Sequence, residues 1–205
     1  SDVIDVKANI ELTSALTVSG NVTVKSSNGS SILRAASYKD NMFVVANGGT
    51  LALENITING NRTSQQTADL ATEMIVVQAG GTLNFNDGTT LTTNRGNAAV
   101  SGGGITVMGT MNMNGGKIVN IHMHNTNNVS TMYGAAITVK GGTVNMNNGT
   151  IGGSAVGTAD QNDGRNGAVS VLSGTFNMYG GTISGNLANE QGGGAGASVG
   201  TGGQG

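Results

Sequence analysis

Short segments in which apolar and polar residues alternate recur along the chain at nearly constant intervals. The clearest copies read GGTLALENITINGN from Gly48, GGTLNFNDGTTLTTN from Gly80, GTMNMNGGKIVN from Gly109, GGTVNMNNGTIGGS from Gly141 and SGTFNMYGGTISGN from Ser173. The threonine that follows the glycines recurs at separations of 32, 28, 33 and 32 residues, at Thr50, Thr82, Thr110, Thr143 and Thr175. A degenerate copy begins at Ser19. This period predicts a repeat protein in which each copy forms one structural unit.

The alternation within each copy predicts strands that bury one face, because side chains along a strand point to opposite sides in turn. Three apolar columns are expected to point inward. The first column contains Leu51, Leu83, Met111, Val144 and Phe176. The second contains Leu53, Phe85, Met113, Met146 and Met178. The third, after a Gly/Asn turn, contains Ile58, Leu91, Ile118, Ile151 and Ile183.

A further short strand precedes each glycine pair, as at Ile137–Val139 and Val169–Val171. Three short strands per copy, joined by Gly/Asn corners, predict one rung of a parallel β-solenoid. One rung cannot bury its apolar face alone, but stacked rungs share a continuous core. We therefore expect an all-β, single-domain solenoid over residues 1–205, with about seven rungs. The absence of proline agrees, since proline would remove a ladder hydrogen bond.

Composition narrows the possible partners and chemistry. Charged residues make up 10% of the chain and the net charge is −2, which argues against a nucleic-acid partner. No apolar run approaches the roughly 18 residues of a membrane-spanning helix, so we expect no membrane insertion. The chain has no cysteine, which excludes disulfides, thiolate metal sites and cysteine nucleophiles.

The motifs resemble those of a known family. The opening VIDVKANIELTSALTVSGNVTVKSS resembles the first coils of bacterial extracellular right-handed parallel β-helix proteins. The phrases GGTLALENITINGN and GTFNMYGGTISGN resemble coils of pectin-lyase-like repeats in surface proteins and adhesins of Gram-positive and gut bacteria. This resemblance covers nearly the whole chain and implies a right-handed coil in an extracellular protein, at the bacterial cell surface or secreted. We expect the chain to be a fragment of a longer surface protein.

The fold carries enzymes, adhesins and stalks alike, so function rests on other features. We expect a non-catalytic adhesin or stalk module whose partner is a polysaccharide, or a glycan or protein of a host surface. A polysaccharide lyase or hydrolase stays open, but it needs carboxylates brought together by stacking. No Asp or Glu lies between Asp87 and Asp160, so we expect no catalytic residue. A structural element that self-associates through its end rungs also stays open.

The loops after Ile118 and Ile151 are long, belong to adjacent copies and carry most of the unusual polar residues. Because they leave from adjacent rungs, their side chains are expected to converge on one shallow site for sugars. The candidate ligand-binding residues are His122, His124, Tyr133, Asp160, Asp163 and Arg165. The alternative is that these loops are only solvated and that binding occurs elsewhere.

We expect neither a metal site nor a cofactor. His122 and His124 alternate along an extended segment and could share a metal ion, but no third ligand is evident. Asp160 and Asp163 match only part of a calcium-binding loop and lack its distal glutamate. We interpret that segment as a solvated turn.

Threonine and asparagine recur at outward positions of one predicted strand. They form two parallel columns with about 4.8 Å between rungs. The members are Thr82, Asn84, Thr110, Asn112, Thr143, Asn145, Thr175 and Asn177. We expect these side chains to hydrogen-bond along the stack; a match to ice or to a polysaccharide surface is the alternative.

Overall fold

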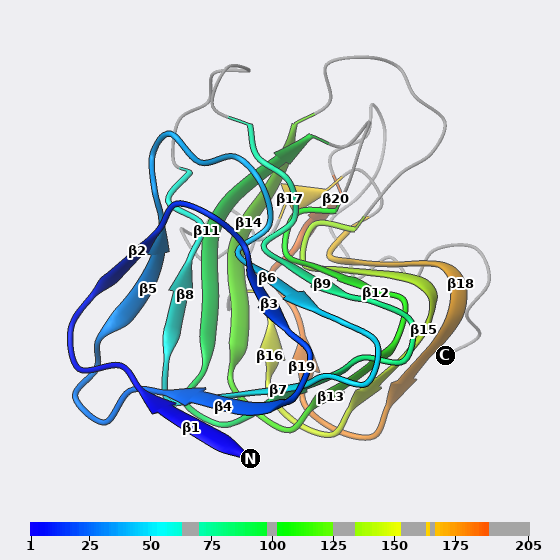
Figure 1. The fold of residues 1–205 in the computed structure, drawn as a ribbon. Coiled ribbons are helices and arrows are strands. Elements are labelled where there is room, and N and C mark those ends of the chain that lie inside the picture. The colour runs from blue at the N-terminus through cyan, green and yellow to red at the C-terminus, as the bar shows by residue number, and fades with distance from the viewer. Residues whose placement is uncertain (63–69, 98–101, 125–133, 153–162, 165–166, 189–205) are drawn as a thin grey trace.

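The computed structural model describes residues 1–62, 70–97, 102–124, 134–152, 163–164 and 167–188. In this part of the chain every regular element is a strand, and the strands coil as a parallel β-solenoid (Figure 1). The predicted all-β solenoid is therefore confirmed. The described residues include no helix that is long and apolar enough to cross a membrane.

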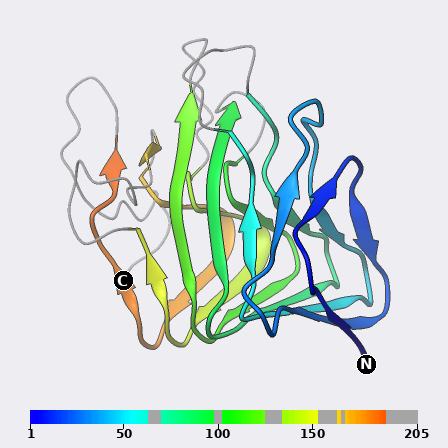
Figure 2. The ribbon, with the colours of Figure 1, turned by 90° about the vertical axis from the view of Figure 1, so that its left-hand side faces the viewer.

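Three ladders of parallel strands run along the solenoid (Figures 1 and 2). The first ladder contains β1 (Asp2–Asp5), β4 (Asn21–Lys25), β7 (Thr50–Glu54), β10 (Thr82–Phe85), β13 (Thr110–Met113), and the second halves of β15 (Ile137–Met146) and β18 (Val169–Met178). The second contains β2 (Ile10–Leu12), β5 (Ser31–Arg34), β8 (Thr57–Asn59), β11 (Thr90–Asn97), β14 (Lys117–His124), β16 (Thr150–Ile151) and β19 (Thr182–Ile183). The third contains β3 (Leu16–Val18), β6 (Phe43–Val45), β9 (Ile75–Val77), β12 (Ile105–Val107), and the first halves of β15 and β18. Two short strands, β17 (Asp163–Gly164) and β20 (Leu187–Ala188), extend the second sheet beside β14.

The predicted count of about seven rungs, each with three short strands, is wrong. About four turns consist of three separate short strands, from β1, β2 and β3 to β10, β11 and β12. Beyond them, β15 and β18 each pass through a corner as one strand of 10 residues. The third strand of one turn is then continuous with the first strand of the next. The pairing of β15 with β18 continues past this corner with register shifts around Lys140.

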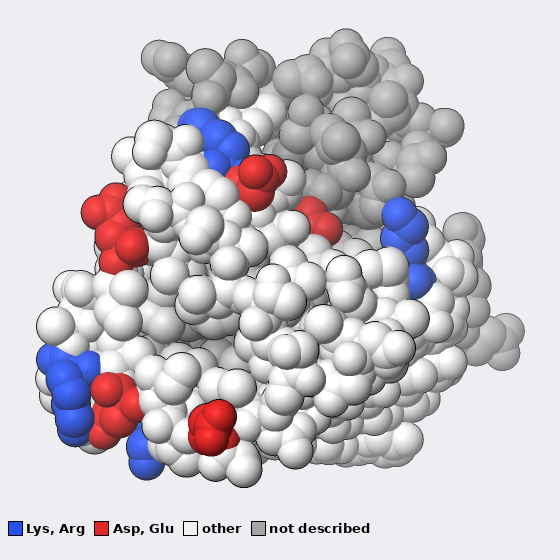
Figure 3. Space-filling view, viewed as in Figure 1, with Lys and Arg blue, Asp and Glu red and all other residues white. Residues whose placement is uncertain are grey.

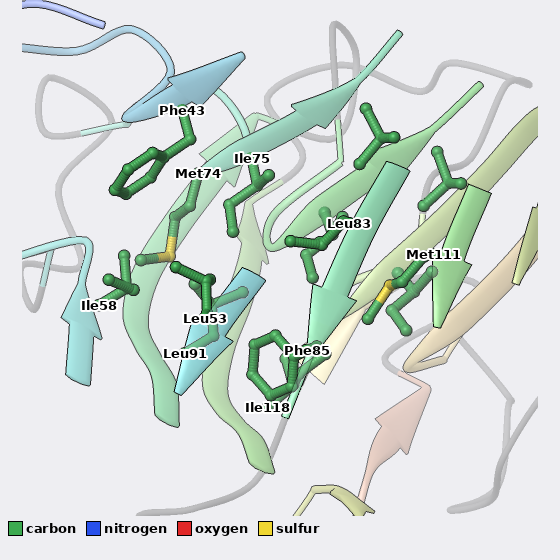
Figure 4. Close-up of a cluster of buried hydrophobic side chains, with 14 of the residues drawn as sticks. Phe43, Leu53, Ile58, Met74, Ile75, Leu83, Phe85, Leu91, Met111 and Ile118 are labelled. Carbon is green, nitrogen blue, oxygen red and sulfur yellow. The ribbon is translucent and has the colours of Figure 1, made fainter. Parts of the chain in front are cut away.

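The three predicted inward columns form the core. Strands stack in register, so that Leu53, Phe85 and Met113 lie directly above one another. These side chains are fully buried, and Figure 4 shows residues of all three columns packed between the ladders. In the last described turn Met178 is 50% exposed and Phe176 is partly buried. Burial of matching apolar side chains in successive turns thus holds the stack together.

A column of glycines occupies the corner before the first ladder, at Gly49, Gly81, Gly109, Gly142 and Gly174. A Cβ atom on Gly142 would collide with the carbonyl oxygen of Gly109, and one on Gly109 would collide with that of Gly81. The recurring glycine therefore allows successive turns to approach at this corner. Gly20 occupies the equivalent position in an earlier turn, since its carbonyl accepts from Thr50 as that of Gly109 accepts from Thr143. Among the described residues, a Cβ on Gly20 would meet no atom within 4 Å.

Candidate functional site

Two strands of the second ladder extend beyond the corner at which the others end. Thr93 in β11 and Asn120 in β14 have φ angles of 60° and 55°, which turn the chain while the pairing continues. The tails of β11 and β14 are followed in the same sheet by β17 and β20 (Figures 1 and 2). We call residues 94–97, 121–124, 163–164 and 187–188 the edge sheet. Both loops predicted to carry the site border this sheet, because β14 ends at His124 and β17 begins at Asp163.

The structure places two of the six predicted site residues side by side. His122 and Asp163 are register partners on β14 and β17. His124 lies two residues farther along β14, and its side chain is outside the described part, as is that of Asp163. Tyr133, Asp160 and Arg165 lie outside the described residues. Convergence of the whole set therefore stays a prediction.

The His122 ring is oriented by a short chain of polar side chains. Its Nε2 lies 2.9 Å from Oδ1 of Asn120. The Nδ2 of Asn120 donates to Oγ1 of Thr93 at 3.4 Å. This orientation of the amide makes Oδ1 the acceptor, so Nε2 of His122 donates. The partly buried imidazole is thus held in one orientation at the edge.

Arg95 is a residue of this site that the sequence analysis did not identify. It is the register partner of His122 on β11, so Arg95, His122 and Asp163 form one row across three adjacent strands. Arg95 is only 7% exposed. The sequence contains a signal for this pairing: Arg95 follows Thr90 by five residues, and His122 follows Lys117 by the same interval. Aligning the copies beyond the Thr-Ile position would have revealed the pair formed by Arg95 and His122, but not Asp163, which lies 13 residues after Thr150.

A buried arginine lies at the base of the edge sheet. The side chain of Arg34 is fully buried. Its Nη1 donates to Oδ1 of Asn94 at 2.7 Å, and its Nη2 donates to the carbonyl oxygens of Thr72 at 3.2 Å and Glu73 at 3.4 Å. Asn94 in turn donates to the carbonyl of Gly103 at 2.6 Å. Arg34 therefore ties together segments from three different turns.

Burial and, to a smaller extent, the charge of the nearby Arg62 lower the pKa of Arg34 to about 10. The group is still protonated at neutral pH. Arg62 is 2% exposed and donates to the carbonyls of Asn61, Ala35 and Tyr38. The two guanidinium groups thus fix the loops at the root of the edge sheet through backbone carbonyls. Neither arginine belongs to the three apolar columns, which is why the sequence analysis missed both.

Replacing Arg34 by methionine is expected to destabilise the fold by about 2 kcal/mol. The change leaves Oδ1 of Asn94 buried without its donor and releases the segment around Thr72. Urea denaturation followed by circular dichroism measures the loss. Lys117→Met removes the same charge from an exposed position on β14 and serves as the control. Equal stability of the two variants would show that the hydrogen bonds of Arg34 do not stabilise the base of the edge sheet.

The described residues add no support for a metal site. Among the residues that the structure describes, no group of three or more His, Asp or Glu lies close enough to hold a metal ion. The side chains of His124, Asp160 and Asp163, which the metal hypotheses require, lie outside those described.

The chain matches no family model, no curated protein and no solved structure. The likeness to pectin-lyase-like surface proteins therefore rests on the sequence motifs alone.

Proposed function

We propose that this chain is a non-catalytic adhesin or stalk module of a bacterial surface protein, which binds glycans or host surface components at the edge sheet and its bordering loops. The observation that supports this proposal is the row formed by Arg95, His122 and Asp163 on adjacent strands. An extracellular location, at the cell surface or in secreted form, belongs to the same proposal and rests on the motif resemblance.

The chemistry of the row suits sugars. Sugar hydroxyls both donate and accept hydrogen bonds, and they are held by a few well-placed polar groups. Within the row, the imidazole of His122 can donate or accept and the carboxylate of Asp163 only accepts, whereas Arg95 is only 7% exposed and is left out of the contact surface. Tyr133, in the loop that follows β14, would supply an apolar ring face.

The scaffold also limits the conformational entropy that is lost on binding. The strands beneath the row are paired in register with the turns on either side. The loops at its root are fixed by Arg34 and Arg62. A preorganised surface loses less conformational entropy on binding than a mobile loop does. Row residues on this rigid support can therefore present their polar groups in a constant arrangement.

A glycan array probed with the purified chain tests the proposal, with host-surface proteins such as fibronectin and collagen on the same array. We expect binding without release of sugar products, and an affinity about tenfold lower in His122→Ala and in Asp163→Ala. Lys117→Ala, an exposed change at the other end of β14, is the matched control and should bind like the parent.

Three outcomes contradict the proposal. Release of unsaturated or hydrolysed sugars from a polysaccharide would indicate an enzyme instead. Self-association without binding to any glycan or host protein would favour a structural role. Binding that His122→Ala and Asp163→Ala leave unchanged would place the site away from the row.

A further inference from the structure

The outer face of the first ladder carries a second regular set of polar side chains. In β10, β13 and the second half of β15, each strand presents one threonine and one asparagine outward, and a second asparagine follows the strand. The register of the strands places these residues in three rows and three columns. We call this surface the amide grid: Thr82, Asn84, Asn86, Thr110, Asn112, Asn114, Thr143, Asn145 and Asn147. In Figure 1 these strands run along the bottom, whereas the edge sheet lies at the top.

The asparagines of the grid are bonded to one another along the stack, as the sequence analysis expected. The inner column consists of Asn84, Asn112 and Asn145. In it, Nδ2 of Asn145 donates to Oδ1 of Asn112 at 3.0 Å, and Asn112 donates to Asn84 at 2.9 Å. The outer column consists of Asn86, Asn114 and Asn147. In it, Asn147 donates to Asn114 and Asn114 donates to Asn86, each at 2.9 Å. The amides are therefore held in fixed planes.

This bonding leaves half of each amide available. A primary amide has two N–H donors and an oxygen with two lone pairs. Asn112 and Asn114 each use one donor and one lone pair within their column. Within the described part of the chain, no other partner is bonded to these two amides. Each can thus still donate one hydrogen bond and accept one, at a fixed position on the face.

The grid is neutral, although its outer column continues into charged residues of the preceding turns. Asn86 donates to Oε1 of Glu54 at 3.3 Å, and Glu54 is the register partner of Lys25 in the preceding turn. None of the nine grid residues carries a charge. In Figure 3 charged side chains lie at the lower left and left, near β1, β2 and β4, and also along the top and at the right, whereas the surface at the lower right is white. A charged ligand gains no ion pair on the grid, whereas a neutral hydroxyl can pair with both halves of an amide.

An exposed aromatic ring lies at the other end of the outer column. The backbone N–H of Tyr179 donates to the carbonyl of Met146 at 2.8 Å, just as that of Asn147 donates to Met113 at 2.8 Å. Tyr179 therefore occupies the next position of the column after Asn147. Its side chain is 72% exposed, which is unusual for an aromatic residue in a chain with only three Tyr and three Phe.

We propose that the amide grid binds a neutral, linear polysaccharide that lies along the solenoid axis, with Tyr179 as a ring on which one sugar stacks. Sugar hydroxyls match the remaining donor and acceptor of each amide, and an apolar sugar face matches the tyrosine ring. A repeating polymer suits a surface that itself repeats at about 4.8 Å. This site is separate from the edge sheet and does not depend on the function proposed there.

Affinity electrophoresis of the full chain tests the site, with hydroxyethyl cellulose, galactomannan and soluble starch as neutral polymers in the gel and polygalacturonate as the acidic polymer. We expect at least one neutral polymer to retard the parent, and Asn112→Lys and Tyr179→Ala to weaken that binding about tenfold. Thr23→Lys adds the same charge at an outward position of β4, outside the grid, and should bind like the parent. His122→Ala should also leave this binding unchanged, which separates the grid from the edge sheet.

Tyr179→Ala changes an exposed side chain and keeps the test informative even if Asn112→Lys does not fold. The proposal is overturned if no neutral polymer retards the parent. It is equally overturned if folded Asn112→Lys and Tyr179→Ala bind like the parent, or if polygalacturonate is the only polymer bound. Sedimentation of the parent as a dimer that Asn112→Lys dissociates would also overturn it, because the face would then be an interface between two copies.

Discussion

Met146→Asp is expected to unfold the solenoid around the last described turns. Met146 is fully buried, and its register partners in the neighbouring turns are Met113 and Met178. The substitution places a carboxylate between apolar side chains and removes most of the methionine volume. Both effects are unfavourable, and together we expect them to cost about 4–5 kcal/mol, which is comparable to the whole stability of many domains.

Thermal denaturation followed by circular dichroism measures this effect. Met146→Leu keeps an apolar side chain of similar volume and should cost less than about 1.5 kcal/mol. Thr143→Asp adds the same charge on the outward side of the same strand and should be nearly neutral. Because a buried carboxyl binds a proton more tightly in the fold, acidification should restore part of the stability of Met146→Asp. A variant that melts like the parent would mean that residue 146 does not face the core.

Gly142→Ala is expected to force two turns apart at the glycine corner, with a loss of about 3 kcal/mol. The added Cβ would meet the carbonyl oxygen of Gly109, and the carbon of Met108 and the oxygen of Val107 lie at 2.8 and 2.9 Å from its position. These are backbone atoms that take part in the pairing of adjacent turns, so no flexible side chain can move aside.

Gly20→Ala is a close control for this change. Gly20 lies at the equivalent corner of an earlier turn, and the described residues leave open space around its Cβ position. We expect this variant to be as stable as the parent or slightly more stable, since alanine restricts the unfolded chain. Equal stabilities for the two variants in urea would show that close stacking is not the reason for glycine at this corner.

The core could be predicted from the sequence because it depends only on periodicity. A period of two assigns the inward face, and a repeat of about 31 residues aligns Leu83, Met111 and Val144 in one column. The register of the strands confirms that alignment. The merging of strands in β15 could not be predicted in this way, because the Gly-Gly pair at residues 141 and 142 has the same composition as the pairs at 48–49 and 80–81, where separate strands meet at a turn.

The candidate site was predicted less completely than the core. Pairing of His122 with Asp163 follows from adjacent rungs, but the path of a long insertion does not follow from the repeat. The burial of Arg34 depends on the carbonyl oxygens of Thr72 and Glu73 in one loop and on the side-chain amide of Asn94 in the following turn. Loop backbone geometry of this kind leaves no periodic signal in a sequence. Arg95 differs, since counting residues from Thr90 suffices to place it.

The asparagine columns give the solenoid a direction that its backbone lacks. Backbone bonds between turns run both ways: Thr82 donates to the preceding turn, and Asn55 donates to the following one. Every asparagine–asparagine bond of the two columns instead points toward the N-terminal turns, so the amide dipoles add and polarise one another. The outer column ends on the carboxylate of Glu54, where the positive end of the summed dipole meets a negative charge. The inner column ends beside Ala52, which offers no acceptor, so a carboxylate introduced at that position would terminate the second dipole as Glu54 terminates the first.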